Sequence, residues 1–261
     1  MKPIASITAI AFASLLVWSC KKNIVSYLET TSTDGQASIK IVHASPYTTN
    51  YPVVIKVNDI RVSNNITNAT PFPGGGLNTG GASSPWYLSM KPGKNQVSLS
   101  VPKVGTSIDS IALFTTNINV EANKYYSAYI TDTAANTKLV LVPENMTTPT
   151  GNTTRFKFVN LIPNVPALDL YWGTNKVASN IAYTGVSPEF TLNRGDTARW
   201  YVRTAGAAPT AAPVAFYPVT TGTSVSAPLT VPYQRVMTVF ARGYSGGTSN
   251  RAPAVSLLYT N

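Results

Sequence analysis

Cysteine and histidine are almost missing from this chain, since each occurs once in 261 residues, as Cys20 and His43. A single cysteine excludes a disulfide within the chain. A single histidine excludes metal sites built from several histidines, and it leaves His43 as the one base open to a serine–histidine catalytic pair. We therefore expect no metal ion and no cofactor.

Charge is also scarce, because Asp, Glu, Lys and Arg together make up 11% of the residues. Long amphipathic helices need more Glu, Lys and Leu than this, whereas Tyr, Val, Ile and Thr dominate the apolar segments and favour strands. The net charge of +10 raises the question of nucleic-acid binding. The basic residues are scattered singly, without a basic stripe and interleaved aromatic residues. We therefore expect an all-β protein that binds no nucleic acid.

The N-terminal segment has the pattern of a secretory signal. Lys2 supplies a positive charge, and the apolar stretch 4–16 follows it. This stretch is too short to span a bilayer, which takes about 20 apolar residues. The sequence LVWSC, ending at Cys20, resembles a bacterial lipobox, whose cysteine receives a diacylglycerol and becomes the first residue after cleavage. The resemblance implies cleavage between Ser19 and Cys20, with Cys20 as the lipid attachment site.

This interpretation assigns residues 1–19 to a signal peptide and residues 20–36 to a lipidated tether. An ordinary secretory signal with a chance cysteine, or a short membrane anchor, is the alternative. Lys21 stands where many inner-membrane lipoproteins carry aspartate, which favours the outer membrane. We therefore expect a lipid-anchored protein of the cell envelope, held to the membrane by its N-terminal lipid, in a leaflet that the sequence leaves open.

Five segments of the first half return in the same order in the second half. The clearest pair is SIKIVHASP and RFKFVNLIP, in which Lys40 and Val42 recur as Lys157 and Val159. The others are VIKVNDIRVSNNI with DLYWGTNKVASNI, LSMKPGKNQVSLSV with FTLNRGDTARWYV, VEANKYYSAYI with VPYQRVMTVFA, and KLVLVP with AVSLLY. Five segments in a shared order indicate an internal duplication.

Apolar and polar residues alternate within these segments with the period of two that is typical of strands. Ile39, Ile41 and His43, for example, share one face of the first segment. Turn residues such as Asn58-Asp59 separate the segments. About seven short strands per copy predict two tandem antiparallel Ig-like β-sandwich domains. Their expected ranges are 37–146 and 155–261, with a linker at 147–154.

The segments IKIVHASP, VPALDLYW…NKVASNIAY and VEANKYYSAYI resemble the bacterial family known as domain of unknown function 4397. The resemblance covers both copies. The first copy keeps the His-Ala-Ser-Pro sequence of the family at residues 43–46, and the second departs from it with Asn-Leu-Ile-Pro. The resemblance implies exported proteins, often lipoproteins, with Ig-like β domains. The family has no established activity, so the resemblance supplies no catalytic residues.

Candidate catalytic groups are few and isolated. His43 is matched in the second copy by Asn160, which is no base at neutral pH, so a structural role at the end of a strand explains both. The ten acidic residues stand mostly alone in expected turns and strand ends, which implies no carboxylate pair for glycoside hydrolysis. Asp169 interrupts an apolar strand, and we expect it to face solvent. We therefore predict no catalytic residue.

The two copies differ most just before their second hairpin. The offset between equivalent residues falls from 115 at Val62/Val177 to 102 at Gly93/Gly195, so the first copy carries 13 more residues. They fall in PFPGGGLNTGGASSPW, residues 71–86, a glycine-rich loop that is costly in entropy to order. A loop of this length inside a compact domain is either functional or disordered.

Aromatic residues beside this loop offer a contact surface. Trp86 follows the loop and is the tryptophan expected to be exposed, whereas Trp172 and Trp200 have the register of core residues. Our hypothesis is that the loop, with Trp86 and Tyr87 at its edge, forms the contact surface of the first domain.

The leading hypothesis for function is a non-enzymatic cell-envelope lipoprotein that serves as a binding, adhesion or structural module. A carbohydrate-binding module of a glycan-uptake system is the alternative, and an uncharacterised hydrolase is the third. The corresponding partners are the membrane, through the lipid, and an envelope protein or polysaccharide.

Overall fold

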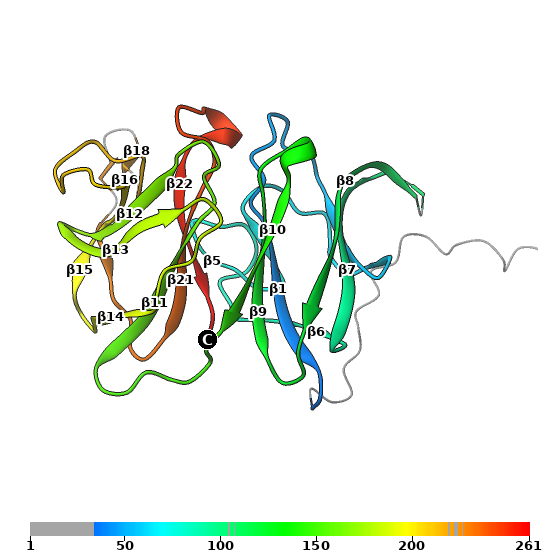
Figure 1. Ribbon diagram of the computed structural model, residues 1–261, viewed down its shortest axis with the longest axis horizontal. Coiled ribbons are helices and arrows are strands. Elements are labelled where there is room, and N and C mark those ends of the chain that lie inside the picture. The colour runs from blue at the N-terminus through cyan, green and yellow to red at the C-terminus, as the bar shows by residue number, and fades with distance from the viewer. Residues whose placement is uncertain (1–33, 104, 107, 219, 222–223, 226) are drawn as a thin grey trace, which may run out of the picture.

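The computed structural model describes residues 34–261 apart from positions 104, 107, 219, 222–223 and 226 (Figure 1). This part of the chain consists of β-strands and two 3-10 turns, η2 (Ala134–Asn136) and η3 (Ser249–Arg251), and it contains no α-helix. Accordingly, it has no helix with the length and hydropathy needed to cross a bilayer. The predicted all-β fold class is confirmed.

The strands before residue 146, apart from β5, form two facing sheets, which we call the first sandwich. Its inner sheet has the order β10-β9-β1-β4, with β6 also paired to β1, and its outer sheet has the order β3-β2-β7-β8. The inner strands are β1 (Ala37–His43), β4 (Thr70–Phe72), β6 (Leu88–Met90), β9 (Tyr125–Thr131) and β10 (Lys138–Glu144). The outer strands are β2 (Val54–Val57), β3 (Ile60–Arg61), β7 (Gly93–Pro102) and β8 (Asp109–Val120).

The second sandwich has an inner sheet of order β14-β11-β21-β22-β5 and an outer sheet of order β13-β12-β16-β17. The inner strands are β11 (Thr153–Asn160), β14 (Phe190–Asn193), β21 (Val236–Arg242), β22 (Ala254–Tyr259) and, from the first half of the chain, β5 (Gly76–Leu77). The outer strands are β12 (Ala167–Trp172), β13 (Asn175–Ala182), β16 (Trp200–Thr204) and β17 (Ala215–Tyr217). Two short pairs are β15 (Thr197–Ala198) with β20 (Leu229–Thr230), and β18 (Thr220–Thr221) with β19 (Ser224–Val225).

One pairing departs from the antiparallel pattern that we predicted, and it does so in both sandwiches. β1 runs parallel to β9, and β11 runs parallel to β21, whereas the other paired strands are antiparallel. A parallel pair needs a long crossover between its strands, and the excursion through the outer sheet supplies one each time. The second half therefore repeats the strand pairing of the first.

The predicted alternation fills the two cores. Ile39 and Ile41 are fully buried between the sheets of the first sandwich. Trp172 and Trp200 lie in the core of the second, with ring centroids 4.6 Å apart, as expected from their register. The turn between β2 and β3 has positive φ at both Asn58 (49°) and Asp59 (63°), as a two-residue hairpin turn requires.

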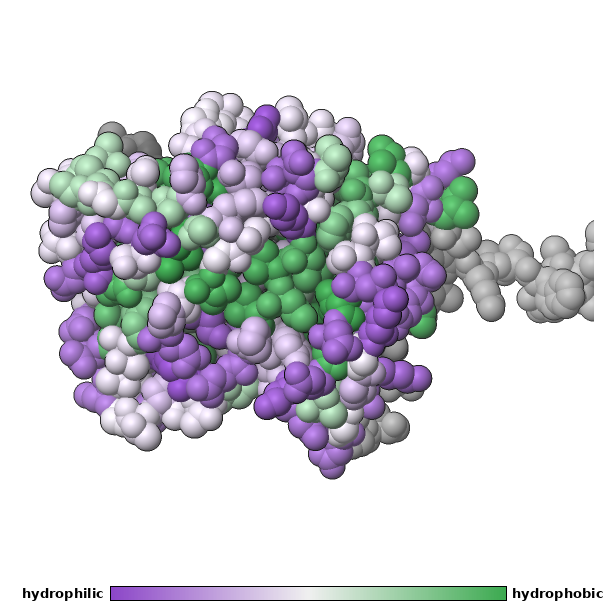
Figure 2. Space-filling model, viewed as in Figure 1, coloured by the Kyte–Doolittle hydropathy of each residue, from purple (hydrophilic) through white to green (hydrophobic). Residues whose placement is uncertain are grey.

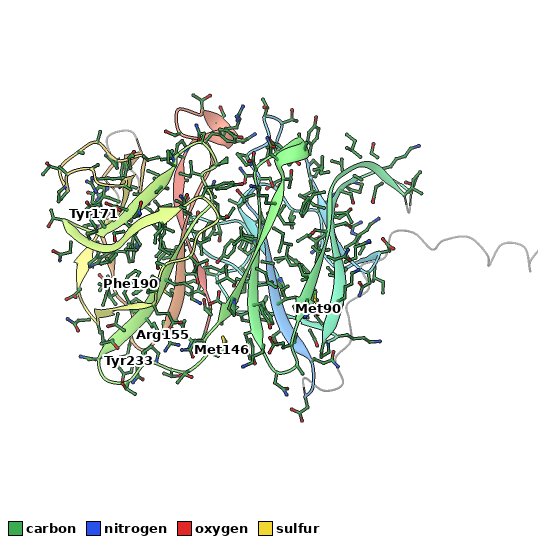
Figure 3. All side chains as sticks on the ribbon, viewed as in Figure 1. Met90, Met146, Arg155, Tyr171, Phe190 and Tyr233 are labelled. Carbon is green, nitrogen blue, oxygen red and sulfur yellow. The ribbon has the colours of Figure 1, made fainter. Side chains whose placement is uncertain are left out.

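The two sandwiches lie side by side, so that four sheets follow one another across the molecule in Figure 1. The outer sheets occupy the two ends, and the two inner sheets face each other in the middle. Figure 3 shows the side chains that fill the spaces between the layers, with Met90 in the first sandwich and Phe190 in the second. Each inner sheet is consequently covered on both faces.

A third hydrophobic cluster joins the inner sheets, and it is built from residues at matching positions of the recurring segments. Its members form four pairs: Val42 with Val159, Ala44 with Leu161, Tyr129 with Phe240, and Val142 with Leu258. The rings of Tyr129 and Phe240 lie 5.4 Å apart. Figure 2 shows hydrophobic surface in the middle of the molecule, over β10, where the two sandwiches meet.

The expectation that Asp169 faces solvent is wrong. Asp169 is only 1% exposed, and its carboxylate lies 2.7 Å from the Lys176 ammonium. It also accepts hydrogen bonds from the backbone amides of Asn180 (2.7 Å) and Gly206 (3.1 Å). The pairing of β12 with β13 is irregular at this residue, and such a bulge redirects a side chain away from the simple alternation.

Candidate functional site

The edge of the inner sheet in the first sandwich is interrupted beside β1. β6 pairs with Ala37–Ile39, and β4 pairs with Ile41–His43, on the same side of β1. Between them the chain leaves the sheet over residues 73–87. In the second sandwich the corresponding connection takes only residues 187–189, between the Val159–Val186 bridge and β14. The longer connection over residues 73–87 thus opens this edge.

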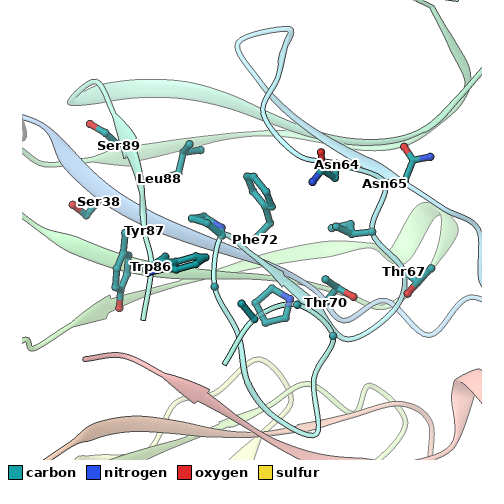
Figure 4. A pocket seen from close by; sticks show the side chains of 17 residues that line it. Ser38, Asn64, Asn65, Thr67, Thr70, Phe72, Trp86, Tyr87, Leu88 and Ser89 are labelled. Carbon is teal, nitrogen blue, oxygen red and sulfur yellow. The ribbon is translucent and has the colours of Figure 1, made fainter. Parts of the chain in front are cut away.

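A groove of about 770 Å³ lies at the interrupted edge. This volume falls within the range of roughly 300–1,000 Å³ that is usual for ligand pockets. In Figure 4, Phe72 occupies its middle, with Ser38, Trp86, Tyr87 and Ser89 toward one end and Asn64, Asn65 and Thr67 toward the other. The lining is completed by Ile66, Thr70, Pro71, Pro73, Gly74, Gly80, Gly81, Ala82 and Leu88.

The two predicted contact residues differ in their accessibility. Trp86 is 60% exposed, as we expected. Tyr87 also lines the groove, but its hydroxyl donates to the carbonyl of Thr260 at 3.0 Å, and the Lys40 ammonium lies 4.5 Å from its ring centroid. Burial, together with the charge of Glu144, raises the pKa of Tyr87, so this phenol stays protonated. Trp86 is therefore the free aromatic surface, and Tyr87 is an anchored part of the wall.

The glycine-rich loop is ordered, and its glycines allow close backbone contacts. A Cβ atom on Gly80 would lie 2.2 Å from Thr70 Oγ1, and one on Gly74 would lie 2.3 Å from the carbonyl oxygen of Ser84. The amide of Gly75 donates to the Ser84 carbonyl (3.1 Å), and that of Gly80 to the Ala69 carbonyl (3.0 Å). Glycine here permits close backbone contacts that a larger residue would block. These contacts offset the entropy cost of ordering the loop.

The groove is uncharged. Among its lining residues, Tyr87 alone carries a titratable side chain, and the polar groups are hydroxyls and side-chain amides. Such a surface stacks against a flat apolar face and exchanges neutral hydrogen bonds. It offers no carboxylate, imidazole or ammonium for acid–base chemistry.

His43 lies buried at the end of β1, outside the lining of the groove. Burial lowers its pKa to about 4, and its Nδ1 atom has no hydrogen-bond partner in the described part of the chain. Asn160, its equivalent, accepts from the amide of Ile162 and donates to the carbonyl of Ile181, both at 3.0 Å. Both residues are thus enclosed at matching strand ends, and the Asn160 side chain bonds to two backbone groups there.

Two carboxylates lie near the same lysine, at the junction of the sandwiches rather than in the groove. Lys157 Nζ lies 2.8 Å from Glu144 and 3.9 Å from Glu189. The Glu144 side chain is fully buried, and neither carboxylate lines the groove. No group of three or more His, Cys, Asp or Glu residues with the spacing of a metal site occurs within the described residues. The lipid attachment predicted at Cys20 lies outside those residues.

The fold and site therefore define an all-β protein of two sandwiches with an uncharged groove at a sheet edge. Comparison with protein families matches residues 37–171 to the domain of unknown function called DUF4397. The chain belongs to this family. The match begins with β1, includes all of the groove's lining residues, and ends within β12 of the second sandwich.

No curated protein matches the chain. Among solved structures, it is similar to CBMbc, a family CBM26 module from Eubacterium rectale Amy13K, crystallised with maltoheptaose. The identity is 11% and the TM-score is 0.23, with 87% of this chain and 97% of that chain covered. A likeness of this size carries no argument about function.

Proposed function

We propose that this chain is a non-enzymatic binding lipoprotein of the cell envelope, anchored through Cys20, with the outer membrane as its site. The N-terminal lipobox and Lys21 support the location. The groove beside β1 supports the binding role, because it combines a suitable volume with an aromatic side chain that is free to meet a ligand.

We also propose that the second half is a second copy of the family's repeat. The five recurring segments support this, as does the strand pairing, in which β11, β21 and β22 repeat the relations of β1, β9 and β10. In this proposal the second copy has kept the framework and lost the long loop, so binding is assigned to the first copy.

The observation that carries the binding role is the exposure of Trp86, the large aromatic residue of the lining that is mostly open to solvent. Large aromatic side chains are usually buried, and their burial contributes strongly to folding. A tryptophan that is 60% exposed, in a groove that Phe72 also lines, leaves apolar surface available to a ligand. Aromatic residues are enriched at interfaces relative to the rest of a protein surface.

A neutral glycan is the ligand class that the groove favours, and a protein partner is the other candidate. The apolar face of a sugar ring stacks on an indole, and its hydroxyls pair with neutral amides and hydroxyls. The groove provides both, with Trp86 toward one end and Asn64, Asn65 and Thr67 toward the other. The absence of charge in the lining argues against acidic polysaccharides, and the absence of carboxylates argues against a glycoside hydrolase.

The test compares Trp86→Ala with Tyr233→Ala, which removes an exposed aromatic residue that lies outside the groove. Binding is measured by titration calorimetry against soluble α-glucan, β-glucan, xylan and mannan. We expect one of these to bind, with at least a tenfold loss in Trp86→Ala and no loss in Tyr233→Ala. Binding that survives Trp86→Ala would remove the groove from the proposal. If none of the four glycans binds, the glycan candidate fails.

A further inference from the structure

The loop that walls the groove leaves the first sandwich and adds a strand to the second. Its residues Gly76 and Leu77 form β5, which pairs with Leu258 and Leu257 of β22. The amide of Tyr259 also donates to the carbonyl of Gly75 at 3.1 Å. A segment of the first half thus extends the inner sheet of the second.

Glycine at position 76 makes this pairing possible. A Cβ atom there would lie 1.8 Å from the carbonyl oxygen of Leu257, so a larger residue would push the two backbones apart. Leu77 follows and packs against the core of the second sandwich. There it lines a small apolar cavity of about 110 Å³ with Trp172, Trp200 and Leu229. The apolar anchor of the loop therefore lies in the other sandwich.

Polar contacts hold the same segment. Asn78 Nδ2 donates to the carbonyl of Val255 at 2.8 Å, and the Ser256 hydroxyl donates to the carbonyl of Asn78 at 2.7 Å. At the far end of the loop, the Tyr87 hydroxyl reaches the Thr260 carbonyl. Both ends of the loop are consequently tied to β22 or to the residue that follows it.

The groove wall lies between these ties. Gly74 adjoins Gly75, whose carbonyl is held by Tyr259, and Trp86 adjoins Tyr87. A loop with five glycines between residues 74 and 81 loses much conformational entropy on ordering. Hydrogen bonds such as Gly75 to Ser84 and Gly80 to Ala69 hold the loop to itself and to the first sandwich. The pairing with β22 and the contacts of Asn78 add to these, so the second sandwich contributes to keeping the wall in place.

We infer that the second sandwich positions the binding groove of the first, with Leu77 and Asn78 as the positioning residues. The groove belongs to the two-sandwich unit, and loosening β5 from β22 opens it. The inference rests on the proposed function only for its effect on affinity, since the positioning of the loop is independent of any ligand.

The experiment compares Leu77→Ala with Leu229→Ala in the full chain. Both substitutions shorten a leucine in the same cavity, but Leu229 belongs to β20 of the second sandwich. Hydrogen exchange followed by mass spectrometry measures the amides of residues 74–87 and of Tyr259. We expect exchange of these amides to be at least tenfold faster in Leu77→Ala than in the wild type, and unchanged in Leu229→Ala, with similar unfolding midpoints for both variants.

Equal exchange of residues 74–87 in the two variants would overturn the inference, as would slow exchange in Leu77→Ala. The glycan that binds the wild type is then titrated into both variants, with a tenfold or greater loss expected for Leu77→Ala alone. If no glycan binds the wild type, the glycan proposal fails while the exchange result still decides the positioning role.

Discussion

Lys40 and Lys157 occupy matching positions in the segments SIKIVHASP and RFKFVNLIP, and each donates to a backbone carbonyl of the other sandwich. Lys40 Nζ contacts the carbonyl of Tyr259, and Lys157 Nζ contacts that of Pro143 at 2.9 Å. Tyr259 and Pro143 are themselves equivalent, since each stands sixth in its segment, AVSLLY or KLVLVP. The two halves therefore exchange the same contact across an approximate twofold relation.

The two lysines differ in how their charge is balanced. Lys157 forms an ion pair with the buried carboxylate of Glu144. Lys40 lies over the ring of Tyr87, and burial lowers its pKa to about 8 against the opposing effect of Glu144. Glu144 is thus the acidic residue at the centre of this junction, and its carboxylate also accepts a hydrogen bond from Thr238 at 3.4 Å.

Breaking the Lys157–Glu144 pair should be costly. Lys157→Met leaves the fully buried Glu144 carboxylate without its cation, and removal of one partner of such a pair typically costs about 3–5 kcal/mol. The double variant Lys157→Met/Glu144→Leu, which removes both charges, should recover most of this loss. The free energy of unfolding in urea measures both effects.

Lys56→Met is the matched control, because Lys56 pairs with Asp109 at 2.7 Å on the more accessible outer sheet. Its cost should stay within about 1 kcal/mol, as for other partly exposed pairs. A loss in Lys157→Met no larger than that in Lys56→Met would show that the buried pair does not stabilise the junction.

His43 should make the protein sensitive to mild acid. Its pKa is about 4 in the folded state, because burial disfavours the charged ring, against 6.5 when unfolded. The unfolded chain takes up the proton first, so stability falls as the pH drops from 6.5 to 4. The loss reaches about 3 kcal/mol at 1.36 kcal/mol per pKa unit.

His43→Asn installs the residue type of Asn160, which stands at the matching position of the recurring segment, and should remove this pH-dependent component of stability. Urea unfolding at pH 7, 5.5 and 4.5 gives the difference in stability between wild type and variant, which cancels the titration of the carboxylates. The difference should shift in favour of the variant as the pH falls. A constant difference over this range would contradict the buried, neutral state of His43.

Much of the fold was predictable because strand periodicity is local. Ile39 and Ile41 alternate as core residues do, and Asn58-Asp59 marks a tight hairpin turn. The neighbours of each strand were not predictable in this way, since parallel pairing of β1 with β9 joins segments far apart in the chain. Lys40 and Val42 lie on the opposite face of β1 from Ile39 and Ile41. Their recurrence as Lys157 and Val159 is a signal in the sequence that this sheet is covered on both faces.

The exposed aromatic residue and the loop of the candidate site were predictable from the sequence, but the contacts that hold them in place were not. An exposed Trp86 followed from its place after a long loop, as did the location of the loop itself. The role of Gly76 did not follow, because a glycine that permits close backbone approach has the same sequence signature as a flexible one. The attachment of Tyr87 to Thr260 depends on tertiary contact between the two halves, which no local pattern records.

The lipid anchor is tested at Cys20. Cys20→Ala removes the thiol that would receive the diacylglycerol, so we expect the variant to lose labelling with a palmitate analogue and to keep its signal peptide. Cys20→Ser removes the same sulfur with a smaller change in size and should behave identically. Labelling that persists in either variant would contradict the lipobox assignment and leave an ordinary secretory signal.

That residues 37–146 and 155–261 form two domains stays a prediction. The contacts at their junction predict that the whole chain unfolds in one step. Eight buried apolar residues, two buried lysines and the β5–β22 pairing connect the sandwiches. Separating the sandwiches would expose this cluster to water, which costs about 25 cal/mol of free energy per Å² of apolar surface. Calorimetry should therefore show a single transition whose calorimetric and van't Hoff enthalpies agree.

Leu258→Asp places an unpaired charge in that cluster and should split the transition in two. Two transitions in the wild type would show instead that the sandwiches unfold independently.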